Sequence, residues 1–223
     1  MKSPPIALVA GATGAVGRRL LELLLARGDG TRVIAVARRP PDASSARLEW
    51  LATELADVPA ALRGRACSEA FCCLGTTMKQ AGSRAAFRAV DLDGVATFAR
   101  ASRSSGAQFF GMVSAAGADP TARNFYLRTK GEAESAVAAL DFPSLAILQP
   151  GLLRGSRDEF RAGEKLGQVA APLLDRLLLG GLARYRSVAI STVAMALDAA
   201  AREPAAGVHR LGPADMEALA RGR

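Results

Sequence analysis

The chain has 223 residues, of which 50% are hydrophobic and 22% are charged. A chain of this length can bury the core of an α/β domain, and its composition is too apolar for an intrinsically disordered protein. Lys and Arg number 29 against 21 Asp and Glu, and the resulting net charge of +8 favours an anionic partner. Because the basic residues are scattered and only 5% of residues are aromatic, a small phosphorylated ligand is expected rather than nucleic acid.

Three cysteines and one histidine give little support for a metal site. Cys67, Cys72 and Cys73 lie far in sequence from His209, so the spacing of a zinc site is missing and no metal is expected. No secretory signal precedes the first apolar run, so we expect a cytoplasmic protein with reduced thiols. No apolar stretch approaches the roughly 20 residues of a membrane span, so no membrane association is expected.

The first elements in chain order are a strand, a helix and a strand. The apolar run Ile6–Ala10 stops at a glycine, as a buried parallel strand does, and a helical period follows from Val16 to Leu24. We expect Gly28 and Gly30 to end this helix before a second strand at Arg32–Ala37. A βαβ unit of this kind requires a parallel sheet.

The alternation of strands and helices continues along the chain. Helices are predicted around Arg84–Arg103, Tyr126–Leu140 and Thr192–Arg202, and strands at Ala70–Leu74, Gln108–Val113, Ser144–Leu148, Val208–Leu211 and, from a weak signal, Leu48–Leu51. This layout predicts a single α/β domain over residues 1–223, with a doubly wound (Rossmann) parallel sheet and helices on both faces. The pattern becomes irregular beyond Pro150, so residues 151–190 are expected to form a small substrate-pocket region.

A glycine-rich loop lies between the first predicted strand and the first predicted helix. Gly11 allows a sharp turn, Gly14 lets the backbone approach a pyrophosphate, and Gly17 lets the helix pack closely on the strand. The N–H groups and the dipole at the start of the helix favour negative charge. A tight turn without a ligand is the alternative, but the strand–helix–strand context favours a dinucleotide site. Its predicted residues are Gly11, Thr13, Gly14, Ala15, Val16 and Gly17.

The end of the second predicted strand bears on which dinucleotide is bound. NAD-binding folds place a carboxylate about 20 residues beyond the loop, where it binds the ribose 2′-hydroxyl. Arg38 occupies that place, and an arginine can pair with a 2′-phosphate. We therefore expect NADP(H) to be preferred, with NAD(H) as the alternative, and we expect Arg18 and Arg39 to add contacts. A solvated arginine at the end of a strand is the other interpretation.

A serine, a tyrosine and a lysine form the third pattern. Ser114 ends a predicted strand, and Tyr126 and Lys130 lie on adjacent turns of one helix face. A phenol ordinarily loses its proton at about pH 10, and a nearby ammonium favours the phenolate, so the pair suits general acid–base catalysis. Lys130 is also expected to hold the nicotinamide ribose, and Ser114 to orient the substrate oxygen. Each residue alone has an ordinary structural explanation, but together, behind a dinucleotide loop, they favour catalysis.

With these motifs the chain resembles the short-chain dehydrogenase/reductases, and within them the atypical Tat-interacting-protein-like branch of small NAD(P)-binding proteins. The resemblance covers nearly the whole chain. Besides the glycine loop, Ser114 and Tyr126-x-x-x-Lys130, it depends on Phe71–Thr77, Val90-Asp91, Ser114–Asp119, Phe125–Glu132 and Gln149–Leu153. It implies that the cofactor cleft is lined by Leu74, Gly75, Thr76 and Thr77, and that the nicotinamide amide is approached by Pro150, Gly151 and Leu152.

Two departures from the family pattern restrict what the resemblance implies. Only about half of a substrate domain follows Pro150, so chemistry on a nucleotide sugar is not expected. Asp91 stands where the family commonly has asparagine, and we assign it no catalytic role. The adjacent Cys72 and Cys73 are expected in the core rather than in a redox centre.

The combined prediction is an NADP(H)-dependent oxidoreductase that acts on a small carbonyl or alcohol by Ser-Tyr-Lys chemistry. The alternative is an NADP(H)-binding regulator or scaffold with little turnover, which eukaryotic members of the branch resemble. Such a protein partner could bind a helix at Leu173–Leu179, although a core helix or a pocket wall is the more frequent role of such a segment. Tyr185 and His209 lie outside every motif and are expected to have structural roles only.

Overall fold

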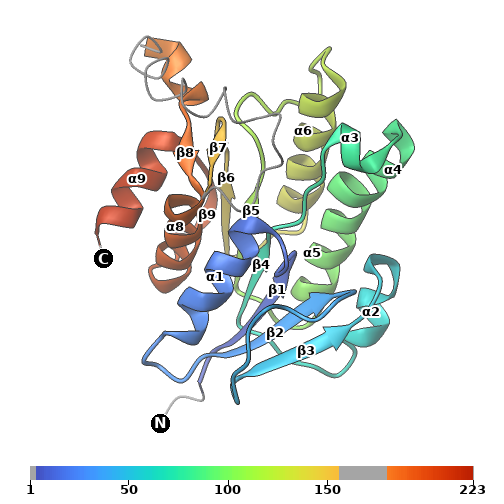
Figure 1. The fold of residues 1–223 in the computed structure, drawn as a ribbon, viewed down its shortest axis with the longest axis vertical. Coiled ribbons are helices and arrows are strands. Elements are labelled where there is room, and N and C mark those ends of the chain that lie inside the picture. The colour runs from blue at the N-terminus through green and yellow to red at the C-terminus, as the bar shows by residue number, and fades with distance from the viewer. Residues whose placement is uncertain (1–3, 156–179, 223) are drawn as a thin grey trace.

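The computed structural model in Figure 1 describes residues 4–155 and 180–222. Its centre is a seven-stranded parallel sheet in the order β3-β2-β1-β4-β5-β6-β9. A two-stranded parallel sheet, β7-β8, lies beyond β6 in the chain. The predicted segment Leu173–Leu179 and the middle of the predicted pocket region lie outside the described residues.

The strands confirm the predicted doubly wound parallel sheet, and the weak signal near Leu48 is a true edge strand. The large sheet consists of β1 (Ile6–Ala10), β2 (Arg32–Ala37), β3 (Leu48–Ala52), β4 (Glu69–Cys72), β5 (Phe109–Val113), β6 (Ser144–Leu148) and β9 (Gly207–Leu211). The small sheet consists of β7 (Leu153–Arg154) and β8 (Val188–Ala189). The order reverses between β1 and β4, which is where doubly wound sheets bind ligands at the carboxyl ends of their strands.

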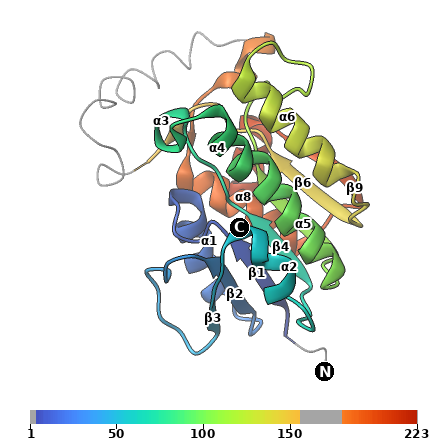
Figure 2. The ribbon, with the colours of Figure 1, turned by 90° about the vertical axis from the view of Figure 1, so that its right-hand side faces the viewer.

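Helices cover both faces of the large sheet (Figures 1 and 2). One face packs against α1 (Ala15–Leu25), α8 (Ile190–Arg202) and α9 (Pro213–Arg221), and the other against α2 (Val58–Ala61), α5 (Val95–Ser104) and α6 (Phe125–Ala138). Two short helices, α3 (Met78–Ala81) and α4 (Arg84–Arg88), follow β4. Successive side chains of β1 point to opposite cores, with Leu8 in one and Val9 in the other. The apolar run of β1 is therefore explained by burial on both faces.

Two predicted helices differ from expectation in detail. The first ends at Leu25, with Ala26 in a right-handed conformation at the cap, so Gly28 does not terminate it. Just after Ala26, the Arg27 N–H donates to the carbonyl oxygen of Leu24 at 3.2 Å, and the buried side chain of Arg27 binds Glu69. The helix expected over Arg84–Arg103 is α4 and α5 joined by a π-helical turn at Ala89–Gly94.

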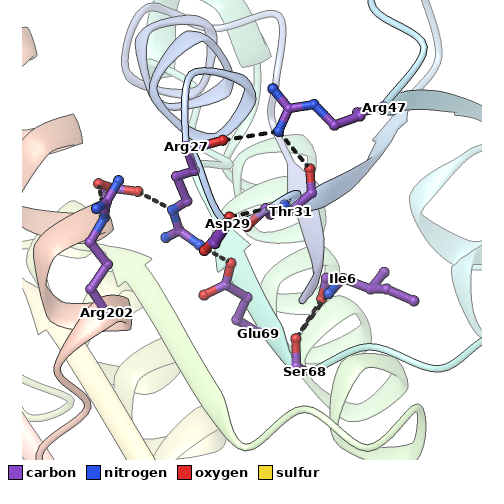
Figure 3. A network of polar contacts seen from close by, with 9 residues as sticks. Ile6, Arg27, Asp29, Thr31, Arg47, Ser68, Glu69 and Arg202 are labelled. Atoms are coloured by element: carbon purple, nitrogen blue, oxygen red, sulfur yellow. Dashed lines mark hydrogen bonds and ion pairs between the residues drawn. The ribbon is translucent and has the colours of Figure 1, made fainter. Parts of the chain in front are cut away.

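A buried ion network fixes the amino-terminal edge of the sheet (Figure 3). The guanidinium of Arg27 binds Glu69, the first residue of β4, and its Nε donates to Asp198 Oδ1 at 2.7 Å. Arg202 binds the other oxygen of Asp198 at 3.1 Å. Burial raises the pKa of Glu69, although Arg27 acts in the opposite direction. The network ties α1, β4 and α8 together at the edge opposite the carboxyl ends of the strands.

The three cysteines are free and none forms a disulfide. Cys67 and Cys72 are buried, whereas Cys73 is half-buried. Burial raises the pKa of Cys67 to about 11 and that of Cys72 to about 12. Both thiols are therefore protonated at neutral pH. The burial of Cys72 confirms that it is a core residue, and Cys73 is partly buried against the other core cluster.

Candidate cofactor-binding and active site

The glycine loop joins β1 to α1 in a conformation that two of its glycines require. Gly11 has a φ of +78°, and a Cβ there would lie 2.5 Å from the carbonyl oxygen of Cys73. A Cβ on Gly17 would lie 2.1 Å from the carbonyl oxygen of Gly11. At Gly14 the nearest atom would be 3.4 Å away, an ordinary contact, and Gly14 is exposed. The loop is thus closely packed toward β4 and open on its outer side at Gly14.

The start of α1 offers free N–H groups to an anion. Gly14 is the N-cap residue, and no side chain accepts a hydrogen bond from the N–H groups of the first turn, which begins with Ala15 and Val16. Thr13 beside it is also exposed. A glycine cradle that a Cβ would fill, followed by uncapped N–H groups, fits the diphosphate of a dinucleotide.

The arginines expected to bind the adenosine end of the cofactor are exposed and make only long contacts with other described residues. Arg38 and Arg39 follow β2, and Arg38 Nε is 4.0 Å from Glu54 Oε2, with both side chains largely in solvent. Arg18 lies on the first turn of α1, where its Nη2 donates to the carbonyl oxygen of Thr13 at a long 3.5 Å. Such loosely held guanidinium groups can turn toward a ligand, because exposed ion pairs contribute little.

A buried ion pair lies beside the end of β4. Lys130 Nζ is 2.7 Å from Asp91 Oδ1, and both side chains are almost inaccessible to solvent. The second oxygen of Asp91 accepts a hydrogen bond from the Thr76 N–H at 2.9 Å. A Cβ on Gly75 would lie 3.7 Å from both charged atoms. Lys130 is therefore held against the segment that the family resemblance assigns to the cofactor cleft. This segment also includes Leu74 and Thr77, and Thr77 is the N-cap residue of α3.

Asp91 and Glu134 hold residues of this site, and the sequence analysis gave neither of them such a part. Asp91, to which we assign no catalytic role from the sequence, pairs with Lys130 and accepts a hydrogen bond from the Thr76 N–H. It lies in the π-helical turn between α4 and α5, a type of irregularity that is frequent at functional sites. The signal in the sequence was the departure from asparagine, since a carboxylate in a buried helix needs a cationic partner.

Ser114 is held by a second buried carboxylate, that of Glu134. The Ser114 hydroxyl donates to Glu134 Oε1 at 2.5 Å, and Gln149 Nε2 donates to the same oxygen at 2.8 Å. Arg210 Nε, from β9, donates to Oε2 at 3.1 Å. Since the single proton of Ser114 is engaged by Glu134, its oxygen is left with lone pairs for a ligand.

Tyr126, Lys130 and Glu134 follow one another at intervals of four residues on α6, so they lie along one face of the helix. Tyr126 is 37% exposed, and its ring packs on Phe87 with centroids 5.7 Å apart. The structure thus aligns the predicted tyrosine and lysine, and it connects Ser114 to the same helix through Glu134.

The turn after β6 packs beside the segment that carries Ser114. The Ala116 N–H donates to the carbonyl oxygen of Pro150 at 2.8 Å. A Cβ on Gly151 would lie 2.4 Å from the carbonyl oxygen of Tyr185, and Leu152 is 52% exposed. Tyr185 ends the 3₁₀ helix Gly180–Tyr185, and a Cβ on Gly117 would lie 3.0 Å from its hydroxyl. Tyr185, which no motif indicated, therefore lies close to the loop after β5.

Two further observations concern only the part of the chain that the structure describes. Within it, no group of three or more His, Cys, Asp or Glu side chains is arranged to hold a metal ion. No helix among these residues combines the length and the apolar character that crossing a membrane requires.

The chain is similar to known proteins over most of its length. A family model described as NAD(P)H-binding matches residues 11–173. The rat protein HTATIP2 is 32% identical over 166 residues, which cover 72% of this chain and 67% of the rat protein. The mitochondrial protein FMP52 of Coccidioides immitis is 34% identical over 166 residues, which cover 69% of this chain and 68% of that relative.

The fold is also found among solved structures. A short-chain dehydrogenase/reductase superfamily protein from Agrobacterium tumefaciens, solved with bound NAD, has a TM-score of 0.67 and 19% identity, and the match covers 97% of this chain and 81% of that one. Since the fungal relative is named mitochondrial, the cytoplasmic location stays a prediction. By its family model, its relatives and its fold, the chain belongs to the NAD(P)H-binding atypical short-chain dehydrogenase/reductases of the Tat-interacting-protein-like branch.

Proposed function

We propose that this chain is an NADP(H)-dependent oxidoreductase that acts on a small carbonyl or alcohol through Ser114, Tyr126 and Lys130. The observation that carries the proposal is that the segment after β4 lies against both the glycine loop and Lys130. The glycine loop packs on Cys73, which directly follows β4, and Gly75, two residues later, packs against the buried ammonium of Lys130. A dinucleotide on the loop would therefore extend toward Lys130.

Residues of the carboxyl edge would hold the cofactor in three places. The cradle of Gly11, Gly14 and Gly17 would hold the diphosphate, and the exposed Arg38 and Arg39 would bind a 2′-phosphate. The segment from Gly75 to Thr77 and the turn from Pro150 to Leu152 would line the nicotinamide half. The bound nicotinamide supplies or accepts the hydride, and the remaining steps fall to the side chains of this chain.

Three side chains would handle the proton and the substrate. Tyr126 exchanges a proton with the substrate oxygen, and its exposed ring leaves the hydroxyl within reach of a ligand. Lys130 lies one turn further along α6 and is held by Asp91, so that its ammonium is fixed beside the ribose position. Ser114 orients the substrate, and because its proton is engaged by Glu134, its oxygen is suited to accept a hydrogen bond from a substrate hydroxyl.

The catalytic role of the tyrosine is tested with Tyr126→Phe. Removing only the hydroxyl should leave the binding of NADPH unchanged, measured by nucleotide fluorescence, and should lower turnover by a factor of about 100 or more. Turnover is measured as NADPH oxidation with a panel of aldehydes, ketones and quinones. Tight cofactor binding by the wild type without turnover of any compound would refute the proposed oxidoreductase activity.

The preference for NADP(H) is tested with Arg38→Glu. This change should weaken NADPH binding much more than NADH binding, because only NADPH carries the 2′-phosphate. Arg32→Glu is the matched control, since Arg32 is exposed at the opposite end of the same strand. Equal losses for the two nucleotides would contradict the role assigned to Arg38.

A further inference from the structure

A cavity of about 500 Å³ lies beside the first turns of α1, next to the glycine loop. One wall is formed by α1, with Ala15, Arg18 and Arg19 among its residues. The opposite wall is formed by Arg154 of β7 and by the start of α8, including Ser191. None of the motifs in the sequence pointed to Arg154.

The charges that line this cavity are not balanced. Arg19 pairs with Glu22 at 2.5 Å, so the charge of Arg19 is already compensated. Arg18 contacts only the carbonyl oxygen of Thr13, at 3.5 Å, and among the described residues no carboxylate pairs with Arg18 or Arg154. Among the described residues, the cavity is therefore lined by two guanidinium groups without a carboxylate partner, one from α1 and one from β7.

Arg154 also has an unmet hydrogen-bonding group. Its Nε is buried and has no hydrogen-bond partner among the described residues. The other two such atoms in the described part of the chain belong to Arg27 and Asp91, and both of those residues take part in buried ion pairs. Buried donors are almost always paired, so this guanidinium nitrogen calls for an acceptor, which an anion or a water molecule can supply.

The backbone of Arg154 is fixed in place. It pairs with Ala189 in the small sheet β7-β8, and the neighbouring Val188 N–H donates to the carbonyl oxygen of Leu152 at 2.9 Å. The side chain consequently starts from a defined position between the turn after β6 and α8. A planar guanidinium held in this way can bind a phosphoryl group through two nitrogens.

We propose that this cavity is an anion site in which Arg154 and Arg18 bind a phosphoryl group. The group belongs either to the diphosphate of the cofactor, since Ala15 directly follows the glycine cradle, or to a phosphorylated substrate. The first source rests on the proposed function, whereas the second does not depend on it. In both cases the site adds a phosphate contact that the glycine loop alone does not provide.

The site is tested by equilibrium titration of the full chain with two probes, ADP-ribose and inorganic phosphate. ADP-ribose carries the diphosphate without the nicotinamide, and phosphate reports the bare anion site. The variants are Arg154→Gln and Arg18→Gln, with Arg154→Lys as the conservative variant. Arg32→Gln is the matched control, because it removes the same charge from an exposed arginine at the start of β2, outside this cavity. Thermal unfolding of each variant shows that it is folded.

With the diphosphate as ligand, Arg154→Gln and Arg18→Gln should each weaken ADP-ribose binding about tenfold or more, the size expected for a charge-assisted hydrogen bond. Arg154→Lys should recover part of that loss, and Arg32→Gln should bind like the wild type. Unchanged ADP-ribose binding with loss of phosphate binding would instead assign the site to a phosphorylated substrate. If Arg154→Gln and Arg18→Gln bind both probes as tightly as the wild type, the anion site is overturned. It is also overturned if the wild type binds neither phosphate nor ADP-ribose. Failure of NADPH and NADH to bind, with phosphate binding intact and dependent on Arg154, would overturn only the proposed function.

Discussion

Three glycine-to-alanine changes separate the packing role of the loop from its ligand-binding role. Gly17→Ala introduces a methyl group 2.1 Å from the carbonyl oxygen of Gly11 and 3.0 Å from the Cα of Ala12, so it clashes with the backbone. Gly14→Ala introduces one at 3.4 Å from its nearest atom, on the open side of the loop. Gly28→Ala serves as the control, because a Cβ there meets nothing within 4 Å.

The size of the effect at Gly17 follows from that distance. Restoring an ordinary contact requires α1 to move about 1 Å away from the loop, and overpacking against a rigid neighbour costs about 3 kcal/mol or somewhat more. For a chain of this length, 1 kcal/mol corresponds to about 2–4 °C, so the melting temperature should fall by about 6–12 °C. At Gly14 the φ of −82° suits alanine, so the cost should stay below about 1 kcal/mol.

Thermal unfolding and NADPH titration distinguish the three variants. Gly17→Ala should lose stability and, because the helix start moves, cofactor affinity. Gly14→Ala should keep its stability and lose affinity by about tenfold or more, since the methyl group occupies the side where the diphosphate approaches. Gly28→Ala should change neither. If Gly14→Ala binds NADPH like the wild type, or Gly17→Ala melts like it, the reasoning about the loop is wrong.

Three further predictions concern buried groups. Glu134→Gln should destabilise the fold by about 1–3 kcal/mol in chemical denaturation, because a charged acceptor of three hydrogen bonds is lost. As the control, Glu132→Gln removes a half-exposed ion pair and should cost less than about 1 kcal/mol. Burial raises the folded-state pKa of Glu69 above its ordinary 4.5. The wild type should therefore lose stability as pH rises from 4.5 through that pKa, and Glu69→Gln should not show this loss. Parallel profiles of stability against pH for the two proteins would contradict the assignment. Cys72, with a pKa of about 12, should react with a disulfide reagent at pH 8 only as fast as the protein opens. Cys72→Ala checks this by removing one thiol from the slow phase, to which the buried Cys67 also contributes.

Much of the fold could be predicted because its signals are local. A strand buried on both faces, such as β1, is a continuous apolar run, and a glycine loop between a strand and a helix has fixed spacing. The π-helical turn at Ala89–Gly94 could not be predicted, since nothing in its local sequence distinguishes it from an ordinary helix. The predicted end of α1 was wrong because no residue near Leu25 marks the stop, whereas the glycine signal lies further on at Gly28.

The site was predictable only in its motif residues. Tyr126 and Lys130 follow from helical spacing, but the partners that hold the site lie far away in sequence. Asp91 meets Lys130, and Glu134 meets Ser114, only after the helices pack on the sheet. No periodicity within a segment reports such pairs, because they depend on which elements become neighbours. Arg154 was missed for the same reason.

The position of β9 connects the end of the chain to the assembly of the active site. β9 is added to the sheet beside β6, and its Arg210 supplies one of the three donors to Glu134. During synthesis the glycine loop emerges first, whereas the carboxylate that holds Ser114 obtains its cationic partner only after residue 210 has been made. A nascent chain that stops before β9 should thus be able to form the dinucleotide cradle while its serine is still incompletely held.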